Sequence, residues 1–346
     1  MAAPLEKEHC DDCGLIRHTS PPSQAQIEGI FSQDYTLHTR LVDNAFEDQR
    51  QRHYADWVLK LVGSRTVNSI FEVGAGTGSL MAELRRRSPH WRLKGVEPVA
   101  SAVSQAAEGL DIEVGVLRDI DPAALKVDVA LSVNVIEHVH DPIAFLQQSL
   151  ATVVEGGCIV VICPDGDRPT TELLIYDHIH SFTLRAFEKI AQRAGFLIAA
   201  RQTAPAALGA FQAIVFMPGP ASSTSSPMVE DLFERRSSFL NSWKQLDRAL
   251  LTRIGDCSNL WAFGSGENAQ LLRAYAPRSW ERVQEIVADS VGVFDGRPIS
   301  LYEAALTEKR TILLAVRPGI QRVVEERLVA DGNSVIRWDD LVWPDQ

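Results

Sequence analysis

The stretch Ile70-Phe-Glu-Val-Gly-Ala-Gly-Thr-Gly-Ser-Leu80 is the part of the sequence from which the fold is inferred. Its apolar start is typical of a short buried strand, the glycines at positions 74, 76 and 78 predict a tight turn, and a helical pattern follows. A second strand-like run, Leu93–Glu97, comes after that helix and ends in a carboxylate. A strand, a glycine turn, a helix and an acid at the next strand end together predict a nucleoside-binding unit.

The spacing of the three glycines indicates which kind of nucleoside is bound. A dinucleotide site requires Gly-x-Gly-x-x-Gly, whereas here the glycines are Gly74, Gly76 and Gly78, and position 79 is serine. With Glu72 in front of them, they resemble motif I of the class I S-adenosylmethionine-dependent methyltransferases. The resemblance implies an α/β fold with a doubly wound seven-stranded sheet, and S-adenosylmethionine as the cofactor.

Strand-like and helical runs alternate after the glycine turn, which predicts a parallel sheet with crossover helices. We expect strands at Ser69–Val73, Leu93–Glu97, Ile112–Leu117, Val127–Val135 and Cys158–Cys163. We expect helices at Phe46–Val62, Leu80–Arg87, Ala100–Ala107 and Pro142–Val154. The domain is completed by a helix between an N-cap Thr183 and Gly195, then strands at Phe196–Gln202 and Ala210–Met217. By the resemblance, the last strand is antiparallel.

The residues expected to hold the cofactor lie at the turn and at the strand ends. Glycines let the backbone approach a ligand closely, and the N–H groups of the helix start suit a methionine carboxylate. Glu97 is placed to accept hydrogen bonds from both ribose hydroxyls, and Asp119 to accept one from the adenine amino group. An ordinary tight turn is the alternative interpretation of the glycines.

The segment from Asp128 to Pro142 also resembles this family, because an apolar strand ends in Asn and is followed by Glu-His and Asp-Pro. In the family this strand end lies against the cofactor, which implicates Asn134 and Ile136. Glu137 and His138 are interpreted as a structural loop pair rather than as catalytic groups.

The acceptor side is expected at Tyr176-Asp-His-Ile-His-Ser-Phe-Thr183, the loop after the fifth strand. Ligands of open α/β sheets bind at this carboxyl end of the strands. Methyl transfer to an O–H or C–H group requires removal of a proton, and histidine titrates near neutral pH. We therefore predict His178 as the general base, with His180 and Tyr176 as substitutes. The alternative is one buried, hydrogen-bonded histidine and one solvated histidine.

The whole layout resembles the sugar C-methyltransferases of deoxysugar biosynthesis, which combine an N-terminal cysteine-rich zinc module, a class I core and a C-terminal Rossmann-like domain. Cys10-Asp-Asp-Cys13 is similar to the second cysteine pair of that module, but the first pair is missing. His9 and His18 could complete a site, yet a lone Cys-x-x-Cys is weak evidence for zinc, and no metal is predicted.

The catalytic stretch of that family departs from this sequence. Aligned on His178, Asp177 stands for the family's glutamate and Ile175 stands where the family has tyrosine, with Tyr176 one place away. His178 therefore inherits the role of base by resemblance, while C-methylation and O-methylation both stay open.

The sequence predicts four parts. They are an N-terminal cysteine-containing arm at 1–45, a methyltransferase core at 46–218, a linker at 219–228, and a second, smaller Rossmann-like α/β accessory domain at 229–346. The turn from Gly264 to Ala269 satisfies Gly-x-Gly-x-x-Ala, and Asp289 follows at the distance of a dinucleotide site. The family resemblance instead implies a domain that helps to hold a sugar-nucleotide substrate or shapes the cleft.

The amino-acid composition argues against two classes of partner, nucleic acids and membranes. The net charge of −11 argues against nucleic acid, since phosphate binding requires clustered Lys and Arg. No run approaches the ~20 apolar residues of a membrane span, and the N-terminus lacks the apolar region of a signal peptide, so we expect a cytoplasmic protein.

The sequence thus predicts S-adenosylmethionine-dependent methylation of a small molecule, with a nucleotide-linked or otherwise activated sugar as the favoured acceptor. One rival is a nicotinamide-dependent oxidoreductase that uses the Gly264 turn. Another is a non-catalytic cofactor-binding module that scaffolds a biosynthetic complex, for which His178→Ala would leave the biological activity intact. The oligomeric state is not indicated.

Overall fold

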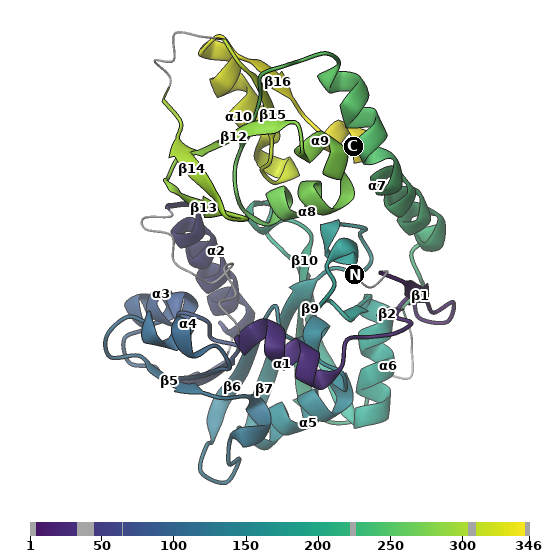
Figure 1. Cartoon of the computed structure of the whole chain (residues 1–346). Coiled ribbons are helices and arrows are strands. Elements are labelled where there is room, and N and C mark those ends of the chain that lie inside the picture. Colours follow the sequence, from purple (N-terminus) through teal and green to yellow (C-terminus); the bar gives the residue numbers. More distant parts are fainter. Residues whose placement is uncertain (1–4, 33–44, 64, 222–225, 304–308, 343–346) are drawn as a thin grey trace. The chain divides into compact units, whose positions relative to one another are not determined.

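The computed structural model describes residues 5–32, 45–63, 65–221, 226–303 and 309–342. The chain divides into two compact units, Met1–Phe233 and Glu234–Gln346 (Figure 1). The division lies a few residues beyond the predicted linker 219–228, of which residues 222–225 lie outside the described ranges. The predicted N-terminal arm belongs to the first unit, as far as it is described.

A seven-stranded mixed sheet forms the centre of the first unit, in the order β5-β4-β3-β6-β7-β10-β9. The first five of these strands in the chain are parallel, and β10 runs antiparallel to both β7 and β9, as expected of the last strand. Their bounds are β3 Ser69–Val73, β4 Arg92–Glu97, β5 Asp111–Val114, β6 Val127–Val133, β7 Val153–Pro164, β9 Phe196–Thr203 and β10 Phe211–Pro218. The expected doubly wound α/β sheet is therefore present.

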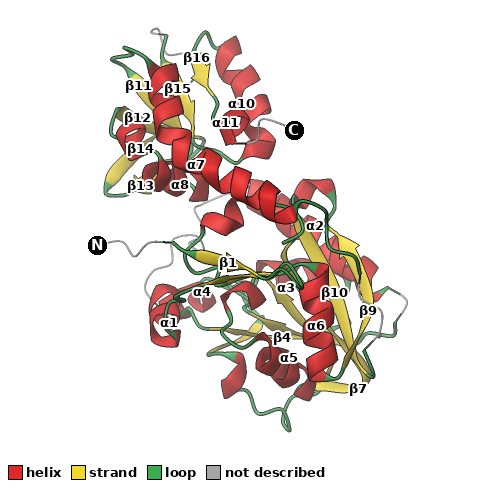
Figure 2. Ribbon diagram, turned by 90° about the vertical axis from the view of Figure 1, so that its right-hand side faces the viewer, coloured by secondary structure: helices red, strands yellow, loops and turns green. Residues whose placement is uncertain are grey.

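Helices cover both faces of this sheet, because side chains of successive strand residues point to opposite sides. Along β7, Ile159, Val161 and Cys163 join one apolar cluster, and Cys158, Val160 and Ile162 join the other. The first cluster includes residues of α5 (Pro142–Ala151) and α6 (Leu184–Ala194). The second includes residues of α2 (Ala45–Val62) and α3 (Ser79–Arg87). Figure 2 shows these helices around the strands.

Several elements end earlier than expected. Helix α5 stops at Ala151 instead of Val154, because β7 already begins at Val153. Strand β6 stops at Val133, because Asn134 takes a left-handed backbone conformation with φ 57°. Strand β5 stops at Val114, and residues Leu117–Asp119 form a 3-10 turn. Helix α4 covers Ala100–Ser104 only.

The N-terminal segment adds a small antiparallel sheet to this unit. Strands β1 (Lys7–His9) and β2 (Ile16–His18) form a hairpin, and β2 pairs with β8 (His180–Ser181), with Arg17 opposite His180. Helix α1 follows at Gln24–Ser32. The beginning of the chain is thereby fixed to the loop in which the sequence predicts the general base.

The second unit contains a six-stranded sheet in the order β13-β14-β12-β11-β15-β16, parallel except for β13. Its strands are β11 Leu260–Phe263, β12 Val283–Ala288, β13 Gly292–Phe294, β14 Arg297–Leu301, β15 Thr311–Leu314 and β16 Ser334–Ile336. Its helices are α8 Glu267–Tyr275, α9 Pro277–Trp280, α10 Pro318–Ala330 and α11 Asp339–Val342, and α7 (Leu232–Ile254) enters it from the first unit.

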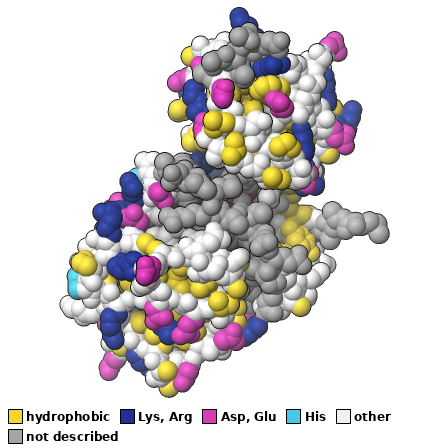
Figure 3. Space-filling view, turned by 60° about the vertical axis from the view of Figure 1, so that its left-hand side comes forward, with side chains coloured by type: hydrophobic (Ala, Val, Ile, Leu, Met, Phe, Trp, Pro, Cys, Tyr) yellow, Lys and Arg dark blue, Asp and Glu magenta, His cyan; other side chains and the backbone are white. Residues whose placement is uncertain are grey.

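The charge of the surface and the length of the helices are relevant to two classes of partner, nucleic acids and membranes. Acidic and basic side chains are interspersed over the face drawn in Figure 3. None of the helices within the described ranges has the length and apolar character to cross a bilayer.

Candidate cofactor and acceptor site

The glycine turn joins β3 to α3 at the carboxyl edge of the sheet. Gly74, Gly76 and Gly78 all have positive φ, at 76°, 55° and 71°, a conformation that glycine adopts at no steric cost. The N–H groups of Gly74 and Ala75 both donate to the carbonyl oxygen of Val96, at 2.9 and 3.1 Å. The turn is thus tied to the neighbouring strand β4.

Two of these glycines also lie close to neighbouring side chains. A Cβ atom on Gly74 would lie 2.5 Å from Val135 Cγ2. A Cβ atom on Gly78 would lie 2.6 Å from the Cδ1 atoms of both Leu110 and Ile112. The close approach of neighbouring side chains therefore accounts for part of the glycine pattern, and access for a ligand is a further use of the same turn.

Glu97 lies at the end of β4 and connects the turn to the next segment. It is buried, and its Oε2 accepts a hydrogen bond from Gly76 N–H at 2.8 Å while Oε1 accepts one from Val99 N–H at 2.9 Å. Burial raises the pKa of Glu97, although these two bonds favour the ionised form. Each carboxylate oxygen has a second lone pair, so Glu97 can still accept from a ribose hydroxyl.

Glu72 is a second buried carboxyl beside the turn. It is 3% exposed, and Oε2 has no hydrogen-bond partner among the described residues. Burial, assisted by the charge of Glu97, raises the pKa of Glu72 to about 8. A cofactor that carries a sulfonium cation would favour the ionised form of both acids if it bound beside them.

Asn134 and Ile136 follow β6 with different surroundings. Asn134 holds φ 57° without being glycine, and its buried Oδ1 has no hydrogen-bond partner among the described residues. A strained residue with an unsatisfied polar atom is a candidate for ligand contact. Ile136 is fully buried in the apolar cluster under α5 and α6, so the structure gives it a packing role, and its contact with a cofactor stays a prediction.

Asp119 has a local role in the structure. Its Oδ2 accepts a hydrogen bond from Val116 N–H at 3.1 Å, which closes the 3-10 turn after β5. The side chain is more than half exposed, at 58%. The predicted bond to an adenine amino group remains a prediction.

A cluster of histidines and acids forms where the turn after β6 meets the loop before β8. The strands β6 and β7 are neighbours, so their carboxyl ends place Glu137, His138 and His178 together. One ligand atom from each of these three residues lies within 4.8 Å of the others. The imidazoles of His138 and His178 meet edge to face, with ring centroids 4.8 Å apart.

Each histidine of this cluster faces a carboxylate. His138 Nδ1 lies 2.9 Å from the carbonyl oxygen of Asp177 and 3.3 Å from its Oδ2, and His178 Nδ1 lies 3.6 Å from Glu172 Oε2. Burial alone lowers the pKa of His138, but the hydrogen bond to Asp177 and the charges of Glu137 and Asp177 raise it on balance. Burial alone raises the pKa of Asp177, but His138 and His178 bring it down to about 2.

The N-terminal hairpin holds the backbone of this loop. Lys7 Nζ donates to the carbonyl oxygens of His178, at 2.9 Å, and Ile175, at 3.4 Å. His18 N–H donates to the carbonyl oxygen of Ile179 at 3.1 Å. Burial lowers the pKa of Lys7 to about 8, although Glu172 and Asp177 favour its charged form. The hairpin thus helps to fix the position of His178 through the backbone of the loop.

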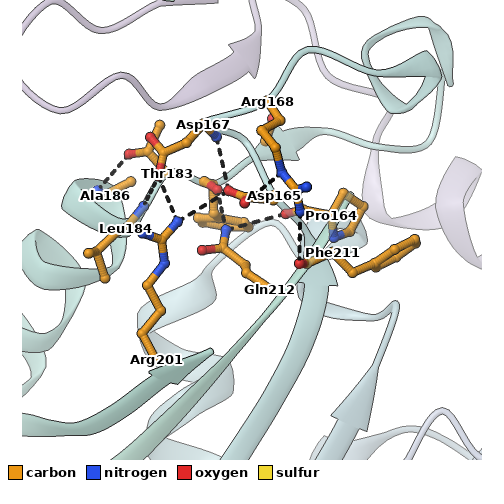
Figure 4. Close-up of polar contacts among 12 residues, drawn as sticks. Pro164, Asp165, Asp167, Arg168, Thr183, Leu184, Ala186, Arg201, Phe211 and Gln212 are labelled. Atoms are coloured by element: carbon orange, nitrogen blue, oxygen red, sulfur yellow. Dashed lines mark hydrogen bonds and ion pairs between the residues drawn. The ribbon is translucent and has the colours of Figure 1, made fainter. Parts of the chain in front are cut away.

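An ion-pair network fixes the other side of the loop (Figure 4). Buried Asp165 accepts from Arg168 Nε at 3.1 Å and from an Arg201 terminal nitrogen at 3.3 Å. Asp167 Oδ2 accepts from Arg201 at 2.9 Å and from the first N–H of α6, that of Leu184, at 3.2 Å. The segment that enters the acceptor loop from β7 is therefore tied to β9 and to α6.

The two substitute bases lie apart from the paired histidines. Tyr176 packs edge-on against His18, with ring centroids 5.7 Å apart. His180 lies in β8 against Phe182, and burial lowers its pKa to about 4. Of the three predicted catalytic residues, the structure brings His178 alone into the cluster with Glu137 and His138.

Cys10 and Cys13 form a turn in which Gly14 N–H donates to the Cys10 carbonyl oxygen at 2.7 Å. Cys10 is exposed and Cys13 is buried. His9 packs edge-on against Phe233, and His18 packs against Tyr176. Among the described residues, these cysteines and histidines do not gather into a group of three potential metal ligands, whereas Glu137, His138 and His178 do.

Comparison with known proteins matches residues 46–200 to a family model described as a methyltransferase domain. The matched segment contains the glycine turn, Glu97, Asn134 and the histidine cluster.

Two curated proteins are similar to this chain over part of their length. An uncharacterized 37.1 kDa protein in transposon Tn4556 of Streptomyces fradiae is 24% identical over 196 residues, which are 54% of this chain and 56% of that protein. Trans-aconitate 2-methyltransferase of Afipia carboxidovorans is 28% identical over 134 residues, which are 37% of this chain and 51% of that protein. The chain thus spans about half the length of the curated relatives that it matches.

Two solved structures are also similar to part of this chain. The mitomycin 7-O-methyltransferase structure has a TM-score of 0.46 at 16% identity, over 57% of this chain and 61% of its own. The 1,6-didemethyltoxoflavin-N1-methyltransferase of Burkholderia thailandensis has a TM-score of 0.46 at 16% identity, over 62% of this chain and 99% of its own.

Proposed function

We propose that the protein transfers the methyl group of S-adenosylmethionine to a small-molecule acceptor that binds beside His178. The proposal rests on the position of two groups of residues at the same edge of the sheet. The glycine turn follows β3, and Glu97 ends β4. The histidine cluster follows β6 and β7, and β6 is the neighbour of β3. Ligands of open α/β sheets bind at this edge.

The cofactor is assigned to the turn and the strand ends. The N–H groups of the turn and of α3 receive the methionine carboxylate, Glu97 receives the ribose hydroxyls, and Glu72 faces the positive end of the cofactor. Asn134 offers its unsatisfied Oδ1. Asp119 and Ile136 keep their predicted contacts with the adenosine as part of this proposal.

The acceptor is assigned to a nucleotide-linked or otherwise activated sugar. The support is the arrangement predicted from the sequence, in which a methyltransferase core is followed by a smaller α/β unit with a mostly parallel sheet. We assign that unit as a Rossmann-like accessory domain. Both C- and O-methylation fit this proposal, and the expected cytoplasmic location belongs to it.

Proton removal from the acceptor is assigned to His178. In the reaction the acceptor atom attacks the methyl carbon, the sulfur–carbon bond breaks, and the acceptor proton passes to a base. His178 is mostly buried, its backbone is held by Lys7, and its Nδ1 faces Glu172. A carboxylate on one ring nitrogen favours a single tautomer, with the proton on that nitrogen and a lone pair on the other.

The test separates cofactor binding from turnover. Calorimetric titration with S-adenosylmethionine and S-adenosylhomocysteine is expected to show binding, and Glu97→Gln should weaken it about tenfold or more, because an amide N–H₂ would face one of two backbone donors. His178→Ala should keep binding and lose transfer to nucleotide sugars. The exposed His90 provides the control His90→Ala, which should leave both unchanged. No binding of either compound would overturn the proposal.

The rival oxidoreductase receives less support from the second unit. Gly264 has φ 108°, and a Cβ atom there would lie 2.7 Å from Val316 Cγ1 and 2.9 Å from the Ala315 carbonyl oxygen. The glycine is thus explained by packing against the end of β15. Asp289, which would bind a ribose, lies 3.0 Å from a terminal nitrogen of Arg327. Titration with NADH is expected to show no binding.

A further inference from the structure

The proposed function assigns no role to Glu137, although a carboxyl group as buried as this one usually has a partner. Glu137 is fully buried in the 3-10 turn after β6, and neither carboxylate oxygen has a hydrogen-bond partner among the described residues. Burying a carboxylate without a partner is costly in free energy, and such groups are usually paired or bind a cation.

The two histidines beside Glu137 are arranged as metal ligands usually are. One potential ligand atom of Glu137, of His138 and of His178 lies within 4.8 Å of the other two. His138 Nδ1 faces Asp177, and His178 Nδ1 faces Glu172. In metal sites a carboxylate or carbonyl on one ring nitrogen orients the imidazole and makes it a stronger ligand.

The charges of the cluster also favour a cation. Glu137, Glu172 and Asp177 are all buried carboxyl groups. Lys7 faces Glu172 and Asp177, and His138 faces Asp177, so these two acids already have positive partners. The oxygens of Glu137 have no hydrogen-bond partner among the described residues, and a divalent cation beside them would supply the compensation that a buried carboxylate requires.

We propose that Glu137, His138 and His178 bind a divalent transition-metal cation, with Asp177 and Glu172 as the carboxylates that orient the two histidines. Imidazole and carboxylate ligands suit Zn²⁺, Co²⁺, Fe²⁺ and Mn²⁺, and three protein ligands leave a coordination position for a water or an acceptor oxygen.

This inference rests on the proposed function in one respect, namely that the cation lies on the acceptor side of the cofactor. A hydroxyl bound to the cation would lose its proton to solvent more readily, and its oxygen would then attack the methyl carbon as the sulfur–carbon bond breaks. A histidine that binds the cation does not also remove the proton. The cation would therefore take over the activation that a metal-free site assigns to His178.

Cation binding can be measured without turnover. The full chain carrying Cys10→Ser and Cys13→Ser, which removes thiolate ligands at the N-terminus, is stripped with a chelator and titrated with Co²⁺. Visible absorption then reports coordination. We expect one equivalent of Co²⁺ to bind, and Glu137→Gln to weaken binding at least tenfold. Glu113→Gln is the matched control, since Glu113 is exposed on β5 and pairs with Lys94.

Two outcomes overturn the inference. They are the absence of Co²⁺ absorption in the chain carrying Cys10→Ser and Cys13→Ser, and binding that Glu137→Gln leaves unchanged. If Glu137→Gln does not fold, His178→Gln serves as the second variant. Circular dichroism of the same samples shows whether each variant is folded. Titration with S-adenosylhomocysteine keeps the two proposals apart, because a folded chain that binds Co²⁺ but no cofactor would sink the proposed function and leave the cation site standing.

Discussion

Among single residues, Glu72 has the property that most directly affects stability. It is fully buried beside Glu97, and its pKa is raised from 4.5 to about 8. Between these two values the folded protein keeps a proton that the unfolded chain releases. The free energy of unfolding therefore falls as pH rises from 4.5 to about 8. The contribution of Glu72 to stability is fully present only below this range of pH.

We expect Glu72→Gln to remove this pH dependence. In the wild-type chain this group lowers the free energy of unfolding by about 1.4 kcal/mol for each pH unit across this range of pH. The glutamine variant should be more stable than wild type near pH 8 and similar to it near pH 4.5. Urea unfolding at several pH values checks this, and parallel curves for both proteins would contradict it.

Asn134 gives a second prediction at this scale. Its φ of 57° costs an alanine about 1 kcal/mol, whereas glycine adopts it freely. Asn134→Ala should therefore lose stability and Asn134→Gly should keep it. Both variants lack Oδ1, so both should bind S-adenosylmethionine more weakly. Cofactor affinity of Asn134→Gly equal to that of wild type would show that the side chain makes no contact.

The turn proposed to hold the cofactor could be located from sequence, because Gly74, Gly76, Gly78 and Glu97 lie at fixed offsets around it. The acceptor side could not be read in the same way. Glu137 and His138 were interpreted as a structural pair, since their partner His178 is distant in sequence and approaches only through the pairing of β6 with β7. The available signal was that both segments follow neighbouring strands at the same sheet edge.

At the scale of elements, the start of α6 is joined to the N-terminal hairpin. Thr183 accepts from Ala186 N–H at 2.9 Å, as predicted of an N-cap, and its hydroxyl donates to the Cys13 carbonyl oxygen at 2.5 Å. The helix ends at Gly195, with φ 76°, also as predicted. The hydroxyl of Thr183 thus joins the start of α6 to the N-terminal hairpin.

We expect Thr183→Ala to destabilise the protein by about 2 kcal/mol, because it removes the cap and leaves the Cys13 carbonyl without this donor. Thr183→Ser keeps the hydroxyl and should lose much less. Urea unfolding of the two variants provides the measurement. Equal losses would instead assign the effect to the methyl group of Thr183.

Element boundaries were predicted less well than the elements themselves. The apolar pattern of residues 142–154 reads as one helix, yet Val153 pairs with Val127 and begins β7. Pairing with a neighbouring strand decides here where the helix ends and the strand begins. The apolar pattern along the chain carries no information about that pairing. The start of β3 at Ser69 and its end at Val73, by contrast, were predicted correctly, because the glycine turn follows directly.

For the whole molecule, the division after Phe233 has a measurable consequence. The proposed cofactor residues all belong to the first unit. We therefore expect two thermal transitions in calorimetry, of which S-adenosylhomocysteine raises one. At 100 times its dissociation constant, the ligand should stabilise that unit by about 2.7 kcal/mol. A shift of both transitions would show that the two units unfold together.

The pairing of β2 with β8 places Arg17 opposite His180 and so sets an order of assembly. During synthesis the N-terminal hairpin leaves the ribosome long before its partner strand exists. The hydrogen bonds of the glycine turn, in contrast, are made to Val96 and Glu97, which follow it closely in the chain. Contacts between distant residues form more slowly than local ones. A refolding or nascent chain should therefore bind the cofactor before it has completed the place where the methyl group is delivered.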